Sequence, residues 1–201
     1  MSQHAKDPIW GTPGVCPVSE DESELRRAHL YDSPRCGGPY GVHETALSQY
    51  FPLQEDIKLL LTSWLIEQRR KGVNCPIITP EVVEGMKHRK PMSVNDRADA
   101  VLAHIYSEAG DRFGKFIDYS GDPQTDQFLR IERSLEDKRR YNELLAYSES
   151  IYDEHLIELK EYLKRNNWIK TLDIGSALLR FSLTPEGCIR AERINRILRN
   201  Q

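Results

Sequence analysis

The order of elements at the C-terminal end most constrains the fold of this chain. The stretch "EHLIELKEYLKRNN" follows Asp153, a favoured helix cap, and its apolar residues recur at helical spacing. The next stretch, "WIKTLDIGSALLRFSLT", has two runs typical of β-strands on either side of Gly175-Ser176, which predicts a hairpin. Thr184 and Pro185 then begin a final helix, "CIRAERINRILRN". A helix, a hairpin and a closing helix in this order predict a winged helix–turn–helix.

The middle of the chain is mostly helical. The apolar spacing in "LQEDIKLLLTSWLIEQRRKG" predicts a helix over 53–71. A second helix begins at Thr79 and Pro80, and a third covers "SVNDRADAVLAHIYSEAG" as far as Gly110. A short strand in "GKFIDYS" and a helical stretch over about 125–147 follow. We therefore expect an α+β fold that is mostly helical.

Two turns near the N-terminus have the spacing of zinc knuckles. A zinc ribbon usually has C-P-x-C-G in each knuckle, because a tight turn must aim two thiolates at one ion. The corresponding segments here are "DPIWG" at 7–11 and "SPRCG" at 33–37. The turn residues are present, but Cys36 is the only cysteine among the four ligand positions. Short strands are expected around Leu30–Tyr31 and Tyr40–Val42.

We expect a degenerate zinc ribbon, in which the turns persist and the ion is lost. Trp10 stands at a ligand position, where an indole indicates apolar packing, while Pro and Gly still serve the turn. The alternative is a residual site that includes Cys36 and nearby residues: Cys16, His4, His29 and His43. The sequence leaves open whether Cys16 and Cys36 meet in space.

Five segments together resemble a known bacterial architecture: "WGTP…DSPRCGG", "LTSWLIEQRRKG", "RADAVLAHI", "AYSES" and "YLKRNNWI…FSLTPEGCIRAERI". Their order is similar to the degenerate zinc-ribbon and winged-helix region ahead of TIR-like or nucleoside 2-deoxyribosyltransferase-like domains. Proteins of this kind occur among bacterial stress-response and phage-defence genes, and the resemblance covers nearly the whole chain. It implies that the enzymatic domain, which would begin near Gln201, is on another polypeptide or is missing.

Nucleic acid is one possible ligand of the C-terminal domain. In a DNA-binding winged helix, the helix before the hairpin enters the major groove and the hairpin touches the backbone. Residues 121–201 hold 14 basic and 14 acidic side chains, so the domain has no strongly basic face. DNA, RNA and protein all remain open as ligands. The candidate nucleic-acid-binding residues are Lys160, Lys164, Arg165, Lys170 and Arg180.

Catalytic motifs are missing from the sequence. Cys36 beside His43, or Cys75 near His88, lacks the oriented third group that activates a thiol. The glycine-rich "RCGGPYG" lacks the spacing of a phosphate-binding loop. We therefore expect no catalytic residue, no metal and no cofactor.

Composition favours a cytoplasmic protein. The net charge is −3, so the chain as a whole has no bulk attraction to phosphate. No apolar run approaches the roughly 18 residues that cross a bilayer, and the N-terminus lacks the layout of a signal peptide. The four cysteines show no disulfide rhythm, which suits a reducing compartment.

These features predict three regions: a degenerate zinc-ribbon-like module at 1–52, a helical middle at 53–120 and a winged helix–turn–helix at 121–201. We expect a non-catalytic recognition or regulatory subunit that couples a partner effector to a nucleic-acid or protein trigger in phage defence. The ribbon and the middle helices would dock the effector, and the winged helix would sense the trigger. The alternative is a transcriptional regulator that binds operator DNA as a symmetric dimer.

Overall fold

The structure is a computed structural model that describes residues 6–12, 27–110, 114–119, 135–172 and 179–199. Within these residues the fold is α+β and mostly helical, as predicted, with two three-stranded sheets. The chain divides into two compact units, residues 1–91 and residues 92–201. None of the helices in the described segments is long and apolar enough to span a lipid bilayer.

The first unit is built on a β-hairpin. β1 (Ala28–Ser33) and β2 (Gly38–His43) pair antiparallel, and the short 3-10 helix η2 (Pro34–Cys36) joins them. β3 (Ile77–Ile78) pairs parallel with β2, which gives the strand order β1–β2–β3. The two short strands expected in this region are confirmed.

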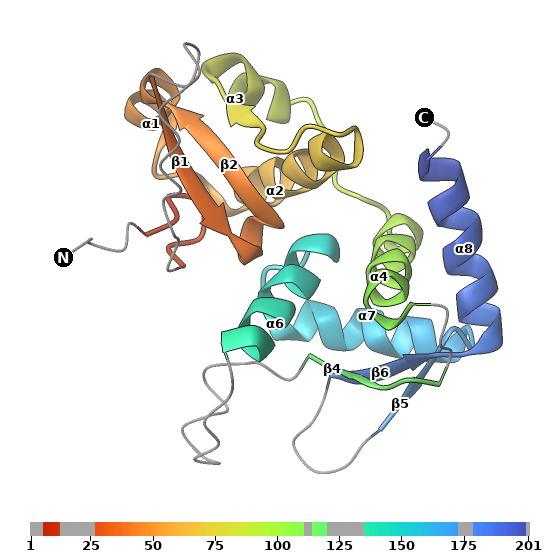
Figure 1. Cartoon of the computed structure of the whole chain (residues 1–201). Coiled ribbons are helices and arrows are strands. Elements are labelled where there is room, and N and C mark those ends of the chain that lie inside the picture. The colour runs from red at the N-terminus through yellow and green to blue at the C-terminus, as the bar shows by residue number, and fades with distance from the viewer. Residues whose placement is uncertain (1–5, 13–26, 111–113, 120–134, 173–178, 200–201) are drawn as a thin grey trace. The chain divides into compact units, whose positions relative to one another are not determined.

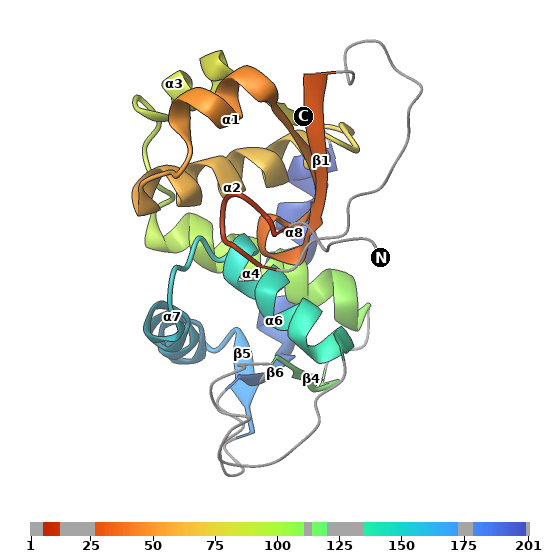
Figure 2. The same cartoon turned by 90° about the vertical axis from the view of Figure 1, so that its left-hand side faces the viewer.

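The described helices of the first unit are α1 (Glu44–Tyr50), α2 (Glu55–Arg70) and α3 (Pro80–Met86). Figures 1 and 2 together show α1 and α2 on one face of the β1–β2 hairpin. α2 is the helix predicted over 53–71, and its Leu61 and Leu65 are buried in one core with Tyr40. α1 was not predicted.

The second unit has a sheet whose central strand comes last in sequence. β6 (Arg180–Leu183) pairs antiparallel with both β4 (Ile117–Asp118) and β5 (Ile169–Thr171), so the strand order is β4–β6–β5 (Figure 1). The described elements, in chain order, are α4 (Val94–Ala109), β4 (Ile117–Asp118), α6 (Leu135–Tyr147), α7 (Asp153–Arg165), β5 (Ile169–Thr171), β6 (Arg180–Leu183) and α8 (Pro185–Arg199).

Local sequence sets the first turn of two helices in this unit. Ser93 and Asp96 form a capping box at the start of α4, in which each side chain accepts the other residue's backbone N–H. Thr184 Oγ1 accepts the N–H of Gly187 at 3.0 Å and so caps α8. A Cβ at position 187 would lie 1.9 Å from the carbonyl oxygen of Trp168, so only glycine fits there.

The C-terminal hairpin is confirmed, because Ile169 of β5 pairs with Leu183 of β6. Its predicted tip at 175–176 lies outside the described residues. Asp153, predicted as the helix cap, is instead the first residue of α7, and Tyr152 is the N-cap. The part of the predicted helix before Leu135 also lies outside the described residues.

The division at 91/92 differs from the boundaries expected after residues 52 and 120. α2 and β3 share the core of the first hairpin, so the first unit extends past residue 52. α4 contributes Leu102 and Ile105 to a second core that contains Phe181 of β6, so the second unit begins well before residue 121. Each unit therefore has a hydrophobic core of its own.

Candidate functional site

Both predicted knuckle turns form in the first unit. In the first turn, Gly11 N–H donates to Asp7 O at 2.7 Å and Asp7 N–H donates to Thr12 O at 2.9 Å. In the second turn, Gly37 N–H donates to Pro34 O at 2.9 Å. Both glycines have a left-handed backbone, with φ of 70° and 74°, which other residues rarely adopt. A hydrogen-bonded turn with a left-handed glycine is therefore present in both segments.

Three of the four knuckle ligand positions come together. Ser33 Oγ donates to Asp7 Oδ2 at 2.7 Å, and Cys36 Sγ lies 3.7 Å from the same oxygen. The fourth position, Trp10, does not join them, because its indole N–H donates to Thr62 Oγ1 of α2 at 2.9 Å. Trp10 is partly buried and packs against the core of the first unit, as expected from its indole.

The Asp7 carboxylate is the centre of this group, which we call the Asp7 cluster. Asp7 is 1% exposed, and its carboxylate accepts hydrogen bonds from one backbone N–H and several hydroxyls, all of them neutral. The donors are the backbone of Ile9 at 2.9 Å and the side chains of Thr12 at 3.1 Å, Ser33 and Tyr40. The Asp7 carboxylate therefore links the two turns through its hydrogen bonds with Thr12 and Ser33.

The Cys36 thiol is not an activated nucleophile. Burial, together with the negative charge of Asp7, raises the pKa of the thiol well above its ordinary value, so the group stays protonated. His43, which is near Cys36 in the sequence, caps α1, since its Nδ1 accepts the Thr45 N–H. Cys16, the alternative metal ligand, lies outside the described residues.

Lys160, the first predicted nucleic-acid-binding residue, faces inward. It is 7% exposed and its Nζ lies 3.6 Å from a carboxylate oxygen of Glu161. This buried position does not favour a contact between Lys160 and nucleic acid. The cause is its place on α7, four residues after Leu156 and three before Leu163, both of which are buried.

The other predicted basic residues reach the surface, but as a small group. Lys164 and Arg165 are exposed at the C-terminal end of α7, and Lys170 is exposed on β5. Arg180 is half-buried, and its guanidinium lies 3.7 Å from the carboxylate of Asp118 on β4. Among the predicted residues, the exposed basic charge therefore lies at the end of α7 and the start of the hairpin, and α8 adds the exposed Arg193 and Arg196.

The rest of the exposed surface of α7 and α8 has a different character. Glu154 and Glu158 are exposed on the first two turns of α7. On α8, Ile189 and Ile197 are 67% and 52% exposed, and their spacing of eight residues places them on one helix face with the exposed Arg193. These surfaces offer carboxylates on α7, and apolar side chains together with the guanidinium groups of Arg193 and Arg196 on α8.

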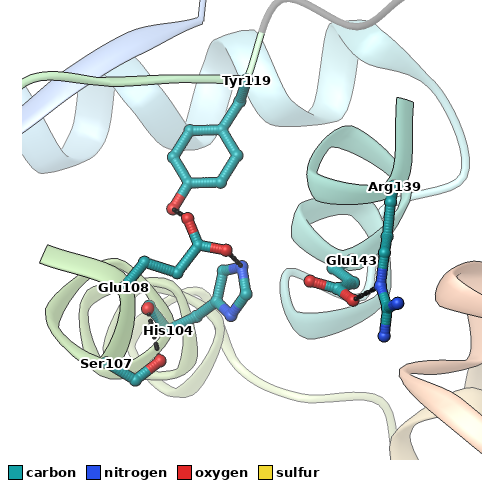
Figure 3. A network of polar contacts seen from close by, with 6 residues as sticks. All are labelled: His104, Ser107, Glu108, Tyr119, Arg139 and Glu143. Carbon is teal, nitrogen blue, oxygen red and sulfur yellow. Dashed lines mark hydrogen bonds and ion pairs between the residues drawn. The ribbon is translucent and has the colours of Figure 1, made fainter. Parts of the chain in front are cut away.

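A second polar cluster lies inside the second unit and was not predicted from the sequence. His104 and Glu108 are one turn apart on α4, and Glu143 comes from α6 (Figure 3). His104 Nε2 is 3.7 Å from Glu108 Oε1. One ligand atom from each of these three residues lies within 4.8 Å of the other two. We call these three residues the His104 cluster.

Neighbouring side chains fix the orientation of the His104 cluster. The imidazole stacks on Tyr147, with ring centroids 4.4 Å apart and planes 16° apart. Tyr119, directly after β4, donates its hydroxyl to Glu108 Oε2 at 2.9 Å (Figure 3). Arg139 donates to one oxygen of Glu143 at 2.9 Å. Each member of the cluster is thus held from its outer side.

Part of this cluster could be recognised from the sequence. "HIYSE" places His104 and Glu108 four residues apart in a strongly predicted helix, so both lie on one face. Nothing local indicates Glu143, because it follows 35 residues later on a different helix.

No protein-family model, curated protein or solved structure matches this chain.

Proposed function

We propose that this chain is a non-catalytic recognition subunit, whose C-terminal unit is a winged helix–turn–helix that binds protein. The order helix, strand, helix, helix, strand, strand, with the last strand between the other two, supports the winged-helix assignment. In that assignment α7 is the recognition helix, and β5 with β6 forms the wing.

The acidic surface of α7 is the observation that carries the proposal. A recognition helix that reads DNA directs its N-terminal residues to base edges between two phosphate backbones. At that end α7 exposes Glu154 and Glu158, and phosphates would repel both carboxylates. With Lys160 buried, a protein surface with basic groups fits this helix better than a nucleic acid does.

The first unit fits a docking role in the same subunit. Its two knuckle turns form a closed cluster around Asp7, with no activated nucleophile at Cys36. We propose that this unit binds a cytoplasmic effector chain and that the winged helix senses a protein trigger. By the resemblance of the sequence, the effector carries a TIR-like or deoxyribosyltransferase-like domain and acts in phage defence.

Operator binding is the second candidate. The observation that favours it is the exposure of Lys164, Arg165 and Lys170, which lie where a winged helix meets the DNA backbone. This function requires a dimer and a strong dependence of affinity on salt.

Two double variants of the full-length chain separate these functions. Glu154→Lys with Glu158→Lys reverses the acidic end of α7, and Lys164→Glu with Arg165→Glu reverses the basic end. Glu44→Lys, an exposed change in the first unit, is the matched control. Each tagged chain is purified from the source cells, and co-purifying chains are identified. Binding to labelled duplex DNA and single-stranded RNA is measured by anisotropy at several salt concentrations.

We expect the wild type to retain a defined partner chain and to bind nucleic acid no more tightly than ~10⁻⁶ M, the non-specific range. The acidic-end variant should no longer co-purify with the protein trigger, whereas the control variant should still do so. If the wild type is a dimer that binds duplex DNA tightly, and the basic-end variant no longer binds that DNA, the result would instead establish operator binding. A monomer without partner or nucleic acid would exclude both functions.

A further inference from the structure

The His104 cluster brings one imidazole and two carboxylates together between α4 and α6. We propose that His104, Glu108 and Glu143 bind one divalent transition-metal ion of the zinc class. Such an ion would join the two helices within the second unit. This site is distinct from the knuckle turns, where the sequence raised the question of metal, and it does not depend on the proposed function.

The spacing of the donor atoms is close to what an ion requires. Two ligands at about 2.1 Å from a tetrahedral ion lie about 3.4 Å from each other. His104 Nε2 and Glu108 Oε1 are 3.7 Å apart, so this pair needs only a small adjustment. The Glu143 oxygen lies within 4.8 Å of both, so the Glu143 side chain must shift toward the other two residues to reach ligand distance.

The cluster is also oriented in the manner of a metal centre. His104 is 7% exposed and stacked on Tyr147, which fixes the plane of the imidazole. Tyr119 holds Glu108 by one oxygen and Arg139 holds Glu143 by one oxygen. Outer hydrogen bonds of this kind commonly orient ligating carboxylates. In Figure 3 the other oxygen of each carboxylate points toward the space between the three residues.

The donor set indicates the class of ion. An imidazole nitrogen favours zinc, iron, nickel or copper over calcium and magnesium, which prefer oxygen alone. Three protein ligands leave at least one coordination position for water, as in open zinc sites. The site can therefore accept a further ligand from solvent.

The charges both favour and limit binding. Glu108 and Glu143 bring two carboxylates close together, and a divalent ion would compensate both. Arg139 already pairs with Glu143, although its side chain is 55% exposed and water screens its charge. Arg140 also brings positive charge close to the cluster, since its charge acts to lower the pKa of the Tyr119 hydroxyl, which burial raises. An ion must compete with these guanidinium groups, so we expect weaker binding than at a closed four-ligand site.

Metal binding to the chelator-treated full-length chain tests the proposal. ZnCl2 is titrated by calorimetry, and CoCl2 is titrated by visible absorption, which distinguishes thiolate ligands from nitrogen and oxygen ligands. The ligand variant is Glu143→Gln, and the matched control is Glu158→Gln, the same change at an exposed carboxylate of the same unit. Tyr119→Phe removes only the outer hydrogen bond. Circular dichroism checks that each variant is folded.

We expect one ion per chain, without thiolate absorption. Affinity should fall at least tenfold in Glu143→Gln, fall roughly tenfold in Tyr119→Phe and stay unchanged in Glu158→Gln. A further variant, Glu143→Cys, should introduce thiolate-to-cobalt absorption, because residue 143 would coordinate the ion directly.

Three results would overturn the proposal. They are an absence of zinc and cobalt binding, binding that Glu143→Gln leaves intact, and thiolate absorption in the wild type. If Glu143→Gln fails to fold, Glu143→Cys and Tyr119→Phe still decide between a metal ligand and a structural carboxylate.

Discussion

Removing the Asp7 carboxylate should strongly destabilise the first unit. The carboxylate is buried and accepts hydrogen bonds from Ile9, Thr12, Ser33 and Tyr40. Asp7→Ala leaves these donors without their acceptor in a space that excludes water. A buried polar group that loses its partner costs about 1–3 kcal/mol. Thr12 and Ser33 can still hydrogen-bond each other, at 3.2 Å, so the Ile9 N–H and the Tyr40 hydroxyl dominate the loss.

We therefore expect the free energy of unfolding to fall by about 3–5 kcal/mol in Asp7→Ala, once the lost side-chain volume is included. Asp7→Asn should cost less, about 1–3 kcal/mol, because the hydroxyls of Thr12 and Ser33 can turn to accept from the new amide. Glu44→Gln, at an exposed position of the same unit, should change the value by less than about 0.5 kcal/mol.

Urea unfolding followed by tryptophan fluorescence measures these values. A Trp168→Phe background leaves Trp10 and Trp64, both in the first unit, as the fluorescent reporters. An Asp7→Ala variant as stable as the control would refute the role given to the carboxylate. If treatment with a chelator destabilised the wild type as much as Asp7→Ala does, the result would show that an ion joins the turns.

The other predictions concern the single residues Gly187, Thr184 and Cys36. Gly187→Ala should destabilise the second unit by about 3 kcal/mol or more, because its Cβ would overlap the Trp168 carbonyl; a thermal midpoint equal to wild type would contradict this. Thr184→Ala should cost about 1 kcal/mol through loss of the α8 cap, measured by the same melt. Cys36 should resist iodoacetamide until unfolding, whereas the half-buried Cys75 reacts earlier; mass spectrometry that finds Cys36 labelled first would contradict this. Since folding raises the pKa of the Cys36 thiol, its contribution to stability should be constant below about pH 8.5, the ordinary thiol pKa, and decline above it.

The sequence predicted elements whose signals are local. The hairpin between β5 and β6 follows from two β-type runs around a turn, and the start of α8 follows from Thr184 and Pro185. The same helical spacing that identified α7 also places Lys160 beside Leu156 and Leu163. The burial of Lys160 could therefore have been predicted from this periodicity. α1 escaped prediction because its cap is a histidine, which is uncommon at that position.

The candidate sites depend on contacts between distant residues, which explains why the sequence predicted them only in part. The knuckle spacing indicated that Asp7 and Ser33 occupy ligand positions, but Tyr40 joins them only through the β1–β2 hairpin. Likewise, His104 and Glu108 share a helix face by their spacing, whereas Glu143 depends on the packing of α6 against α4. Spacing along one element is readable from sequence, but packing between elements is not.

The two polar clusters differ in how their groups would interact with a metal ion. The Asp7 carboxylate is surrounded by neutral N–H and O–H donors, and a cation placed there would face the positive ends of those dipoles. In the His104 cluster, two carboxylates converge on an imidazole, and the carboxylate oxygens present lone pairs to the shared space. The first arrangement competes with an ion, and the second favours one. If this chain binds a metal, the charge pattern therefore favours the helices of the second unit over the turns that resemble zinc knuckles.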